Sequence, residues 1–240
     1  MKPGLSYNQR VFGAGIRGKV HGARFLWLRE TVLRYLPDFS SVVEVGCYDG
    51  RSIRYLPRCP DRYVGLDADW EGGLELARQN WQEKPEYRFI QCKSPADPEV
   101  QACLSDNQSF DIAISLETME HLPDELQEEY LAFIRQNVSR YYLTTVPVEF
   151  GLVFLVKHLI KRFMLGGAYQ YSWAEVLYST LGMTSRVERH QHKGFDWRVY
   201  RDQVSRHFDI VEVRGLPFRW LPVSLNISAA IVATPRKEPL

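Results

Sequence analysis

A chain of 240 residues with 45% hydrophobic and 25% charged residues is typical of globular proteins and long enough to bury one core. The formal net charge of +1 gives no indication of a nucleic-acid partner. The first residues lack the apolar stretch of a secretory signal, and no apolar run is long enough to span a bilayer. Cysteines 47, 59, 92 and 103 lack metal-ligand spacing, so we interpret them as reduced thiols and expect a cytoplasmic location.

The beginning of the chain is basic. Six cations precede the first acid, Glu30: Lys2, Arg10, Arg17, Lys19, Arg24 and Arg29. Residues 1 to about 20 are rich in glycine, and we interpret them as a flexible arm that closes over a site, meets an anionic surface or is simply solvated. Residues 23–36 have nearly helical apolar spacing, and Pro37 ends the predicted helix.

The most informative stretch is residues 41–55. A short β-branched run leads to Gly46, and a helix-like pattern follows Gly50, which predicts a strand, a tight turn and a helix start. Glycine lets a ligand approach the main chain at such a turn. The next predicted strand ends in Asp67, at about the 20-residue interval that is typical of ribose-binding carboxylates. An ordinary strand-to-helix connection is the alternative interpretation.

Strand and helix patterns alternate through the rest of the chain, as expected of a doubly wound parallel sheet. The predicted strands after Asp67 are 87–91, 110–115, 141–146, 208–214 and 226–234, and the predicted helices are 70–81, 96–104, 124–137 and 195–207.

Four segments, 44–50, 65–67, 110–115 and 117–124, resemble in order and spacing the motifs of class I S-adenosylmethionine-dependent methyltransferases. The similarity covers roughly residues 40–147 and is greatest to the small-molecule branch that includes quinone-biosynthesis O-methyltransferases. It implies an α/β fold with a Rossmann-like seven-stranded sheet, mostly parallel with an antiparallel edge strand, and a helical insertion after the fifth strand. The expected single domain comprises an arm and helix (1–38), a cofactor-binding core (39–148), an insertion or lid (149–192) and C-terminal strands (193–240).

The resemblance implies that S-adenosyl-L-methionine is the cofactor. Asp67 would accept hydrogen bonds from both ribose hydroxyls. Glu44 would hold the turn or the amino end of the methionine, or else satisfy loop donors. Two positions depart from the family pattern, because Tyr48 replaces a central glycine and Ser94 follows the third strand where an adenine-binding acid is usual. The other expected cofactor contacts are Gly46, Cys47, Gly50, Ala68, Leu116 and Glu117.

Two other functions compete with this one. A dinucleotide needs close approach of its pyrophosphate to a glycine-rich turn, and Tyr48 obstructs that approach, so an NAD-dependent oxidoreductase is the weaker hypothesis. The other is a non-catalytic cofactor-binding module.

His121 is the candidate general base, because it follows the fourth strand and an imidazole titrates near neutral pH. A capping or packing histidine is the alternative. In some quinone O-methyltransferases the residues that match Glu117, Glu120 and His121 hold a divalent cation, so the resemblance also implies a possible metal site. A second candidate cluster for a metal or a base comprises His190, His192 and Asp196, with a polar loop as the alternative.

Residues 150–189 depart from the alternating pattern. A predicted amphipathic helix places Lys157, His158, Lys161 and Arg162 on one arc and most apolar residues on the other. We expect either a lid packed on the core or a contact with a membrane surface or a lipid-linked substrate through 150–165. The aromatic residues of this segment favour an acceptor with an apolar part, or a glycan.

Overall fold

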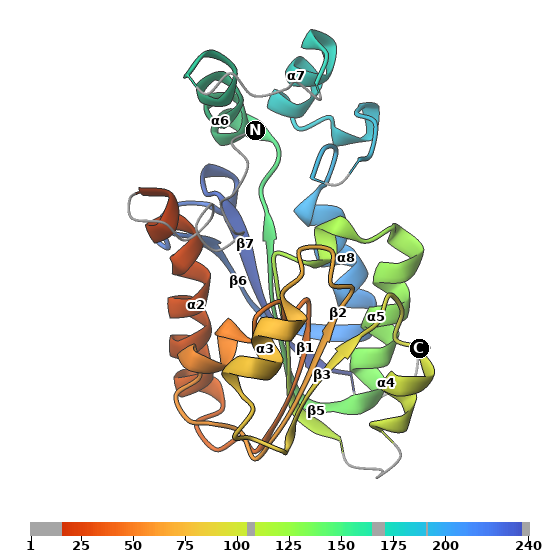
Figure 1. The fold of residues 1–240 in the computed structure, drawn as a ribbon. Helices are drawn as coiled ribbons and strands as arrows, with labels where there is room; N and C mark the ends of the chain where they lie inside the picture. Colours follow the sequence, from red (N-terminus) through yellow and green to blue (C-terminus); the bar gives the residue numbers. More distant parts are fainter. Residues whose placement is uncertain (1–15, 105–108, 165–170, 191, 237–240) are drawn as a thin grey trace.

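The computed structural model describes residues 16–104, 109–164, 171–190 and 192–236. Seven strands form one sheet in the order β3-β2-β1-β4-β5-β7-β6 (Figure 1). The first five are β1 (Ser41–Val45), β2 (Arg62–Asp67), β3 (Tyr87–Gln91), β4 (Phe110–Leu116) and β5 (Val138–Pro147), and they are all parallel. The strand order reverses next to β1, so the carboxyl ends of β1 and β4 flank the place where a ligand is expected.

The last two strands complete the sheet. They are β6 (Phe208–Leu216) and β7 (Ser228–Pro235). β7 runs antiparallel to both β5 and β6, so the antiparallel strand lies one place in from the edge and β6 is the edge strand. The seven-stranded, mostly parallel Rossmann-like sheet that the sequence predicts is therefore confirmed.

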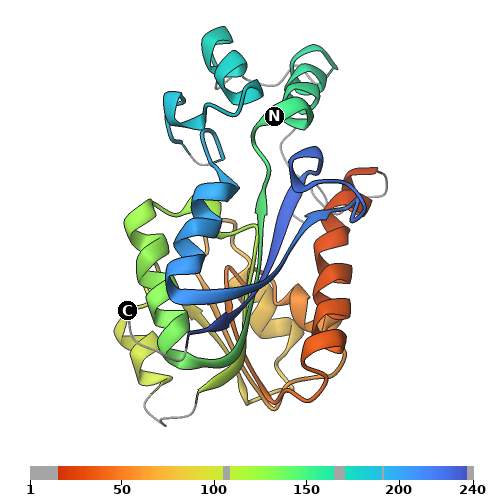
Figure 2. The same ribbon diagram turned by 180° about the vertical axis from the view of Figure 1, so that it is seen from behind.

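Helices cover both faces of this sheet (Figures 1 and 2). One face carries α2 (Ile16–Tyr35), the 3₁₀ turn η1 (Arg51–Tyr55) and α3 (Leu74–Asn80). The other face carries α4 (Pro98–Ala102), α5 (Asp124–Asn137) and α8 (Trp197–His207). Because strands β1 and β4 are covered on both sides, nearly all of their residues are buried.

Two element boundaries differ from the sequence predictions. Helix α2 begins at Ile16, inside the stretch that was expected to be a flexible arm, and the rest of that arm, residues 1–15, lies outside the described residues. Helix α3 begins only at Leu74 because Asp69 and Gly72 have left-handed backbone angles, with φ of 60° and 68°, and form a turn in place of the expected first helical turn.

The expected insertion follows β5. It contains α6 (Gly151–Met164), α7 (Trp173–Thr180) and the 3₁₀ turn η3 (Thr184–Arg186), and it projects beyond the carboxyl end of the sheet (Figures 1 and 2). A last 3₁₀ turn, η4 (Val223–Leu225), lies between β6 and β7 and packs against α6. No helix in the described part of the chain is both long and apolar enough to cross a membrane.

The orientation of α6 tests one part of a sequence prediction. The apolar arc was expected to pack on the domain or on a hydrophobic tail. Phe154 packs inward, whereas Leu152, Val156, Ile160 and Phe163 are exposed, so packing on a hydrophobic tail stays a prediction for these four residues. On the inward side, His158 is buried, and the Lys157 ammonium donates to Oε1 of Glu149 over 2.9 Å. The inward side of α6 thus packs through the buried rings of Phe154 and His158 and through the half-buried ion pair of Lys157 with Glu149.

Candidate active site

The turn after β1 is held against the loop after β4. Gly46 has φ of 78°, and its amide donates to the carbonyl of Leu66 over 2.7 Å. A Cβ added at Gly46 would lie 2.1 Å from Oγ1 of Thr118, so only glycine lets the two loops meet. Thr118 follows β4 and was not singled out from the sequence. Its position directly after Glu117, within the fourth motif, is the sequence feature that could have identified it.

Asp67 and Tyr48 organise the neighbouring loop. The Tyr48 amide donates to Oδ2 of Asp67 over 2.8 Å, and the Asp69 amide donates to Oδ1 over 2.7 Å. Each carboxylate oxygen keeps a second lone pair, and the residue is only partly buried, so the group can also accept ribose hydroxyls. Burial raises the pKa of Asp67, and the two backbone hydrogen bonds oppose that rise.

Tyr48 takes up a conformation that is uncommon for a residue with a side chain. Its φ is 47°, and its ring lies against Gly73, where an added Cβ would come within 2.3 Å of Tyr48 Cδ2. The tyrosine that replaces the family's central glycine therefore keeps the left-handed backbone of the turn. Its ring packs on the loop after β2.

Other expected cofactor residues surround this turn. Cys47 is buried against Gly65 of β2, and the Trp81 indole donates to the carbonyl of Gly50 over 3.2 Å. Ala68 follows Asp67 in the partly buried loop, and Leu116 is buried at the carboxyl end of β4. The structure thus brings these four residues to the same edge of the sheet.

The carboxyl group of Glu44 lies elsewhere. It is buried on the sheet face covered by η1, where the hydroxyls of Ser52 and Tyr63 hydrogen-bond to its Oε2. Burial raises the pKa of Glu44 to about 8, so the group is mostly protonated at neutral pH. This geometry gives Glu44 a direct role in fixing η1 to β1 and β2.

Ser94 is a partly exposed residue in the loop after β3. Its hydroxyl donates to Oε2 of Glu129 over 3.1 Å and accepts from the Ala96 amide over 3.1 Å. The first interaction ties the loop after β3 to α5, and the expected contact between Ser94 and adenine stays a prediction.

The loop after β4 gathers acidic side chains close to cations from other elements. Glu117 has φ of 56°, and its Oε1 is buried without a hydrogen-bond partner among the described residues. Burial raises the pKa of Glu117, while the positive charges of Arg24 and Lys157 oppose that rise. Arg24 thus connects α2 with the site electrostatically, although sequence reasoning assigned it only to a basic arm.

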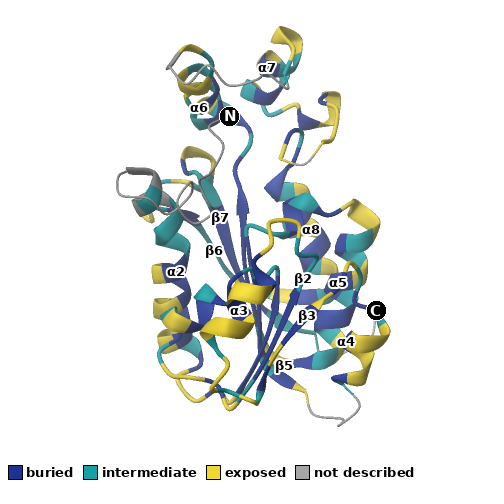
Figure 3. Ribbon diagram, in the orientation of Figure 1, coloured by how far each residue is buried: buried dark blue, intermediate teal, exposed yellow. Residues whose placement is uncertain are grey.

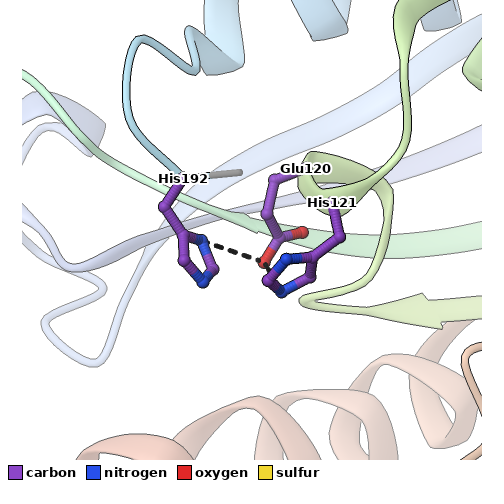
Figure 4. A group of neighbouring side chains, drawn as sticks. All are labelled: Glu120, His121 and His192. Carbon is purple, nitrogen blue, oxygen red and sulfur yellow. Dashed lines mark ion pairs between the residues drawn. The ribbon is translucent and has the colours of Figure 1, made fainter. Parts of the chain in front are cut away.

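Glu120, His121 and His192 form a compact group (Figure 4). Oε1 of Glu120 lies 3.8 Å from Nε2 of His121 and 3.7 Å from Nδ1 of His192. The two imidazole rings meet edge to face, with centroids 4.3 Å apart. Glu120 and His121 belong to the 3₁₀ turn η2 (Met119–His121), whereas His192 comes from the insertion.

Electrostatics make this group unusual. Glu120 is buried, and neither of its carboxylate oxygens has a hydrogen-bond partner among the described residues. Burial and the nearby charge of Glu117 raise the pKa of Glu120 well above its ordinary value. Burial and nearby cations lower the pKa of His121 and of His192 to about 4, so both imidazoles are neutral at pH 7.

Only part of the two predicted metal clusters comes together. Glu117 is not in the compact group, and neither are His190 and Asp196. His190 pairs with Lys193 in a short bridge, and Asp196 caps α8 and binds Thr184 and Arg198. The group therefore combines Glu120 and His121 of the first candidate cluster with His192 of the second.

Comparisons with known proteins agree with this architecture. Residues 42–140 match the family described as a methyltransferase domain. No curated protein matches the sequence. Among solved structures, the chain resembles the PH0226 protein from Pyrococcus horikoshii OT3, with a TM-score of 0.61, 13% identity, and coverage of 97% of this chain and 100% of that chain.

Two further structures carry more descriptive names. An S-adenosylmethionine-dependent methyltransferase from Clostridium acetobutylicum ATCC 824 has a TM-score of 0.59 and 9% identity, with 95% of each chain covered. Magnesium protoporphyrin IX methyltransferase from Synechocystis PCC 6803, solved with bound SAH, has a TM-score of 0.53 and 17% identity, with 95% of this chain and 92% of that chain covered.

Residues 42–140 therefore resemble a methyltransferase domain, and the chain has the fold seen in an S-adenosylmethionine-dependent methyltransferase. These findings support the expected enzyme class and the expected cofactor.

Proposed function

We propose that this protein transfers the methyl group of S-adenosylmethionine to an oxygen atom of a small-molecule, lipid-linked or glycan acceptor. The observation that carries the proposal is the placement of Asp67 and of the Glu120–His121–His192 group at the same carboxyl edge of the sheet, after β2 and after β4. Asp67 would hold the ribose, and the histidine group would face the acceptor.

Methyl transfer from a sulfonium is an in-line displacement that needs alignment of the nucleophile and exclusion of water. The two loops that meet at Gly46 and Thr118 would fix the methionine end of the cofactor beside Leu116 and Glu117. The insertion, whose Arg189 donates to the Glu120 carbonyl over 3.1 Å, would cover the acceptor. Acceptor specificity would then reside largely in residues 150–192.

His121 is the proposed general base. Its lowered pKa keeps a lone pair free at neutral pH but also makes the imidazole a weak base. For a phenol-like hydroxyl with a pKa near 10, the proton transfer would be uphill by about 8 kcal/mol without assistance. The site therefore favours an acceptor whose hydroxyl is acidified.

A divalent cation held by Glu120, His121 and His192 is the alternative to base catalysis by His121, because an imidazole that ligates a cation has no lone pair left to accept a proton. Two imidazole nitrogens and one carboxylate are a common ligand set of catalytic metal sites with open positions. Their ligand atoms all lie within 4.8 Å of one another, and the unpartnered oxygens of Glu120 fit such a role. A bound cation would supply Lewis acidity toward an acceptor hydroxyl.

Incubating the protein with cell extract and deuterium-labelled S-adenosylmethionine, followed by mass spectrometry, tests the proposed transfer. We expect a labelled small molecule, lipid or glycan to form with the native protein. The same product should not form with heat-denatured protein. If the protein binds the cofactor but labels nothing in extracts that contain membranes, a cofactor-binding module without catalysis becomes the better account.

A further inference from the structure

The insertion carries a concentration of exposed apolar side chains. Eight of the 17 exposed large apolar residues in the described part of the chain lie between residues 152 and 183. Phe163 is 73% exposed and Trp173 is 60% exposed. Exposed residues run along both α6 and α7 at the projecting end of the molecule (Figure 3). Exposed apolar patches of this kind mark interaction surfaces.

These side chains form a stripe on each helix. Leu152, Val156, Ile160 and Phe163 follow one another at helical spacings of four and three residues, and Trp173, Leu177 and Leu181 do so at spacings of four. Helices α6 and α7 pack against each other, so the two stripes belong to one projecting unit. We call these seven residues the apolar face.

The opposite side of α6 already has partners. Phe154 and His158 are buried and contact the ring of Tyr171, with centroids 5.0 and 5.8 Å apart. Lys157 is held by Glu149 and by the Val148 carbonyl. The apolar face is therefore not the side by which α6 packs on its own domain.

Charge indicates what would cover this face. Residues 149–192 contain five Lys and Arg and three acids, a net charge of +2, whereas the whole chain has +1. Lys161 is exposed at the end of α6, and the Arg162 guanidinium lies 4.2 Å from the centroid of the Trp173 ring. Two copies of the same cationic face would repel each other, while an anionic surface would attract it.

We propose that the apolar face binds the surface of an anionic lipid bilayer, with Phe163, Trp173 and Leu177 entering the headgroup region. Aromatic rings favour this depth, and flanking cations attract acidic lipids. The segment lies beyond the carboxyl edge of the sheet, so docking would turn the candidate active site toward the membrane (Figure 1). The binding test below requires no methyl transfer, so it is independent of the proposed function.

Co-sedimentation with vesicles tests the proposal. The full-length protein should bind vesicles that contain phosphatidylglycerol about tenfold more tightly than vesicles of phosphatidylcholine alone, because Lys161 and Arg162 flank the apolar face. Raising the salt concentration should weaken the binding. The tryptophan emission should shift to the blue on binding, and Trp173→Phe should remove most of that shift.

Matched variants locate the binding face. Phe163→Ser combined with Leu177→Ser should weaken binding at least about tenfold, because two large apolar groups no longer leave water. Leu33→Ser combined with Val199→Ser alters exposed apolar residues of α2 and α8 and should leave binding unchanged. Lys161→Glu should weaken binding to anionic vesicles several-fold, whereas Arg58→Glu makes the same charge change far from the insertion and should not.

Circular dichroism should show that all variants remain folded, since the altered side chains are exposed. Absence of binding to anionic vesicles by the parent protein would overturn the proposal. Equal losses in the insertion variants and their controls would also overturn it. The proposal would also be overturned if sedimentation without lipid showed a dimer and if Phe163→Ser combined with Leu177→Ser dissociated that dimer. The apolar face would then be a subunit interface.

Discussion

Nδ1 of His192 lies 3.7 Å from Oε1 of Glu120, and this contact joins the end of the insertion to the loop after β4. Glu120 is buried without a hydrogen-bond partner among the described residues, so the group is set up to receive a cation or a hydrogen-bond donor from the acceptor. The insertion is therefore part of the candidate site as well as its cover.

Metal binding gives the first prediction. Chelator-treated protein should bind Zn²⁺ or Mn²⁺ in calorimetry, and His192→Ala should weaken the binding at least about 100-fold, because even changes outside the ligand shell cost about 10–100-fold. His190→Ala is the control, since His190 is close in sequence but lies outside the compact group. Equal effects of the two substitutions would contradict this site.

His121 should matter for turnover more than for cofactor binding. Once an acceptor is known, His121→Gln should reduce kcat by about 10²–10⁴-fold if the imidazole is the base, with an almost unchanged Kd for S-adenosylmethionine. Because the pKa of His121 is about 4, its protonation should reduce the rate only as the pH falls toward that value. A His121→Gln variant with normal kcat would assign the histidine to packing.

The role of Asp67 can be tested by cofactor binding. Asp67→Ala should weaken binding of S-adenosylmethionine by about 2–4 kcal/mol, because two charge-assisted hydrogen bonds to the ribose would be lost. Asp67→Asn should have a smaller effect, since it keeps one acceptor oxygen. Asp61→Ala removes an exposed acid at the other end of the same strand and serves as the control. Unchanged affinity in folded Asp67→Ala would place the ribose elsewhere.

Glu44 should make stability depend on pH. Its pKa is about 8 in the folded protein and ordinarily 4.5, so the folded state keeps a proton that the unfolded state releases. Stability from this group is fully present below about pH 4.5 and is lost as the pH rises toward 8. The free energy of unfolding of Glu44→Gln minus that of the parent should therefore increase by about 3 kcal/mol between pH 5.5 and pH 8. Urea denaturation at several pH values measures this, and parallel pH profiles of the two proteins would refute it.

The sheet could be predicted because its strands are short apolar runs separated by turn residues. The hydrogen-bond partners of Glu44 on β1 could not be predicted from the sequence. Glu44 was expected to hold the turn or the amino end of the methionine, or else to satisfy loop donors. The alternation of side chains along β1 directs it to the face covered by η1, where the hydroxyls of Ser52 and Tyr63 hydrogen-bond to it, and a contact with the methionine stays a prediction.

The candidate site was predictable only where it lies on consecutive motifs. Glu120 and His121 are adjacent in sequence, whereas His190 and His192 were equivalent candidates. His190 pairs with Lys193 in a short local bridge, whereas His192 reaches Glu120, which lies 72 residues earlier in the chain, and such a long-range contact leaves no periodic pattern in the sequence. The same applies to Arg24, which acts on the acidic loop from α2.

The central claim is that the edge formed by Gly46, Tyr48 and Asp67 binds S-adenosylmethionine. Calorimetry of the purified protein with S-adenosylmethionine, S-adenosylhomocysteine and NAD tests it most directly. Binding of the first two ligands, with NAD much weaker because Tyr48 stands where a pyrophosphate needs bare backbone, is the predicted result. Preferential binding of NAD, or no binding of S-adenosylmethionine by the folded protein, would contradict it.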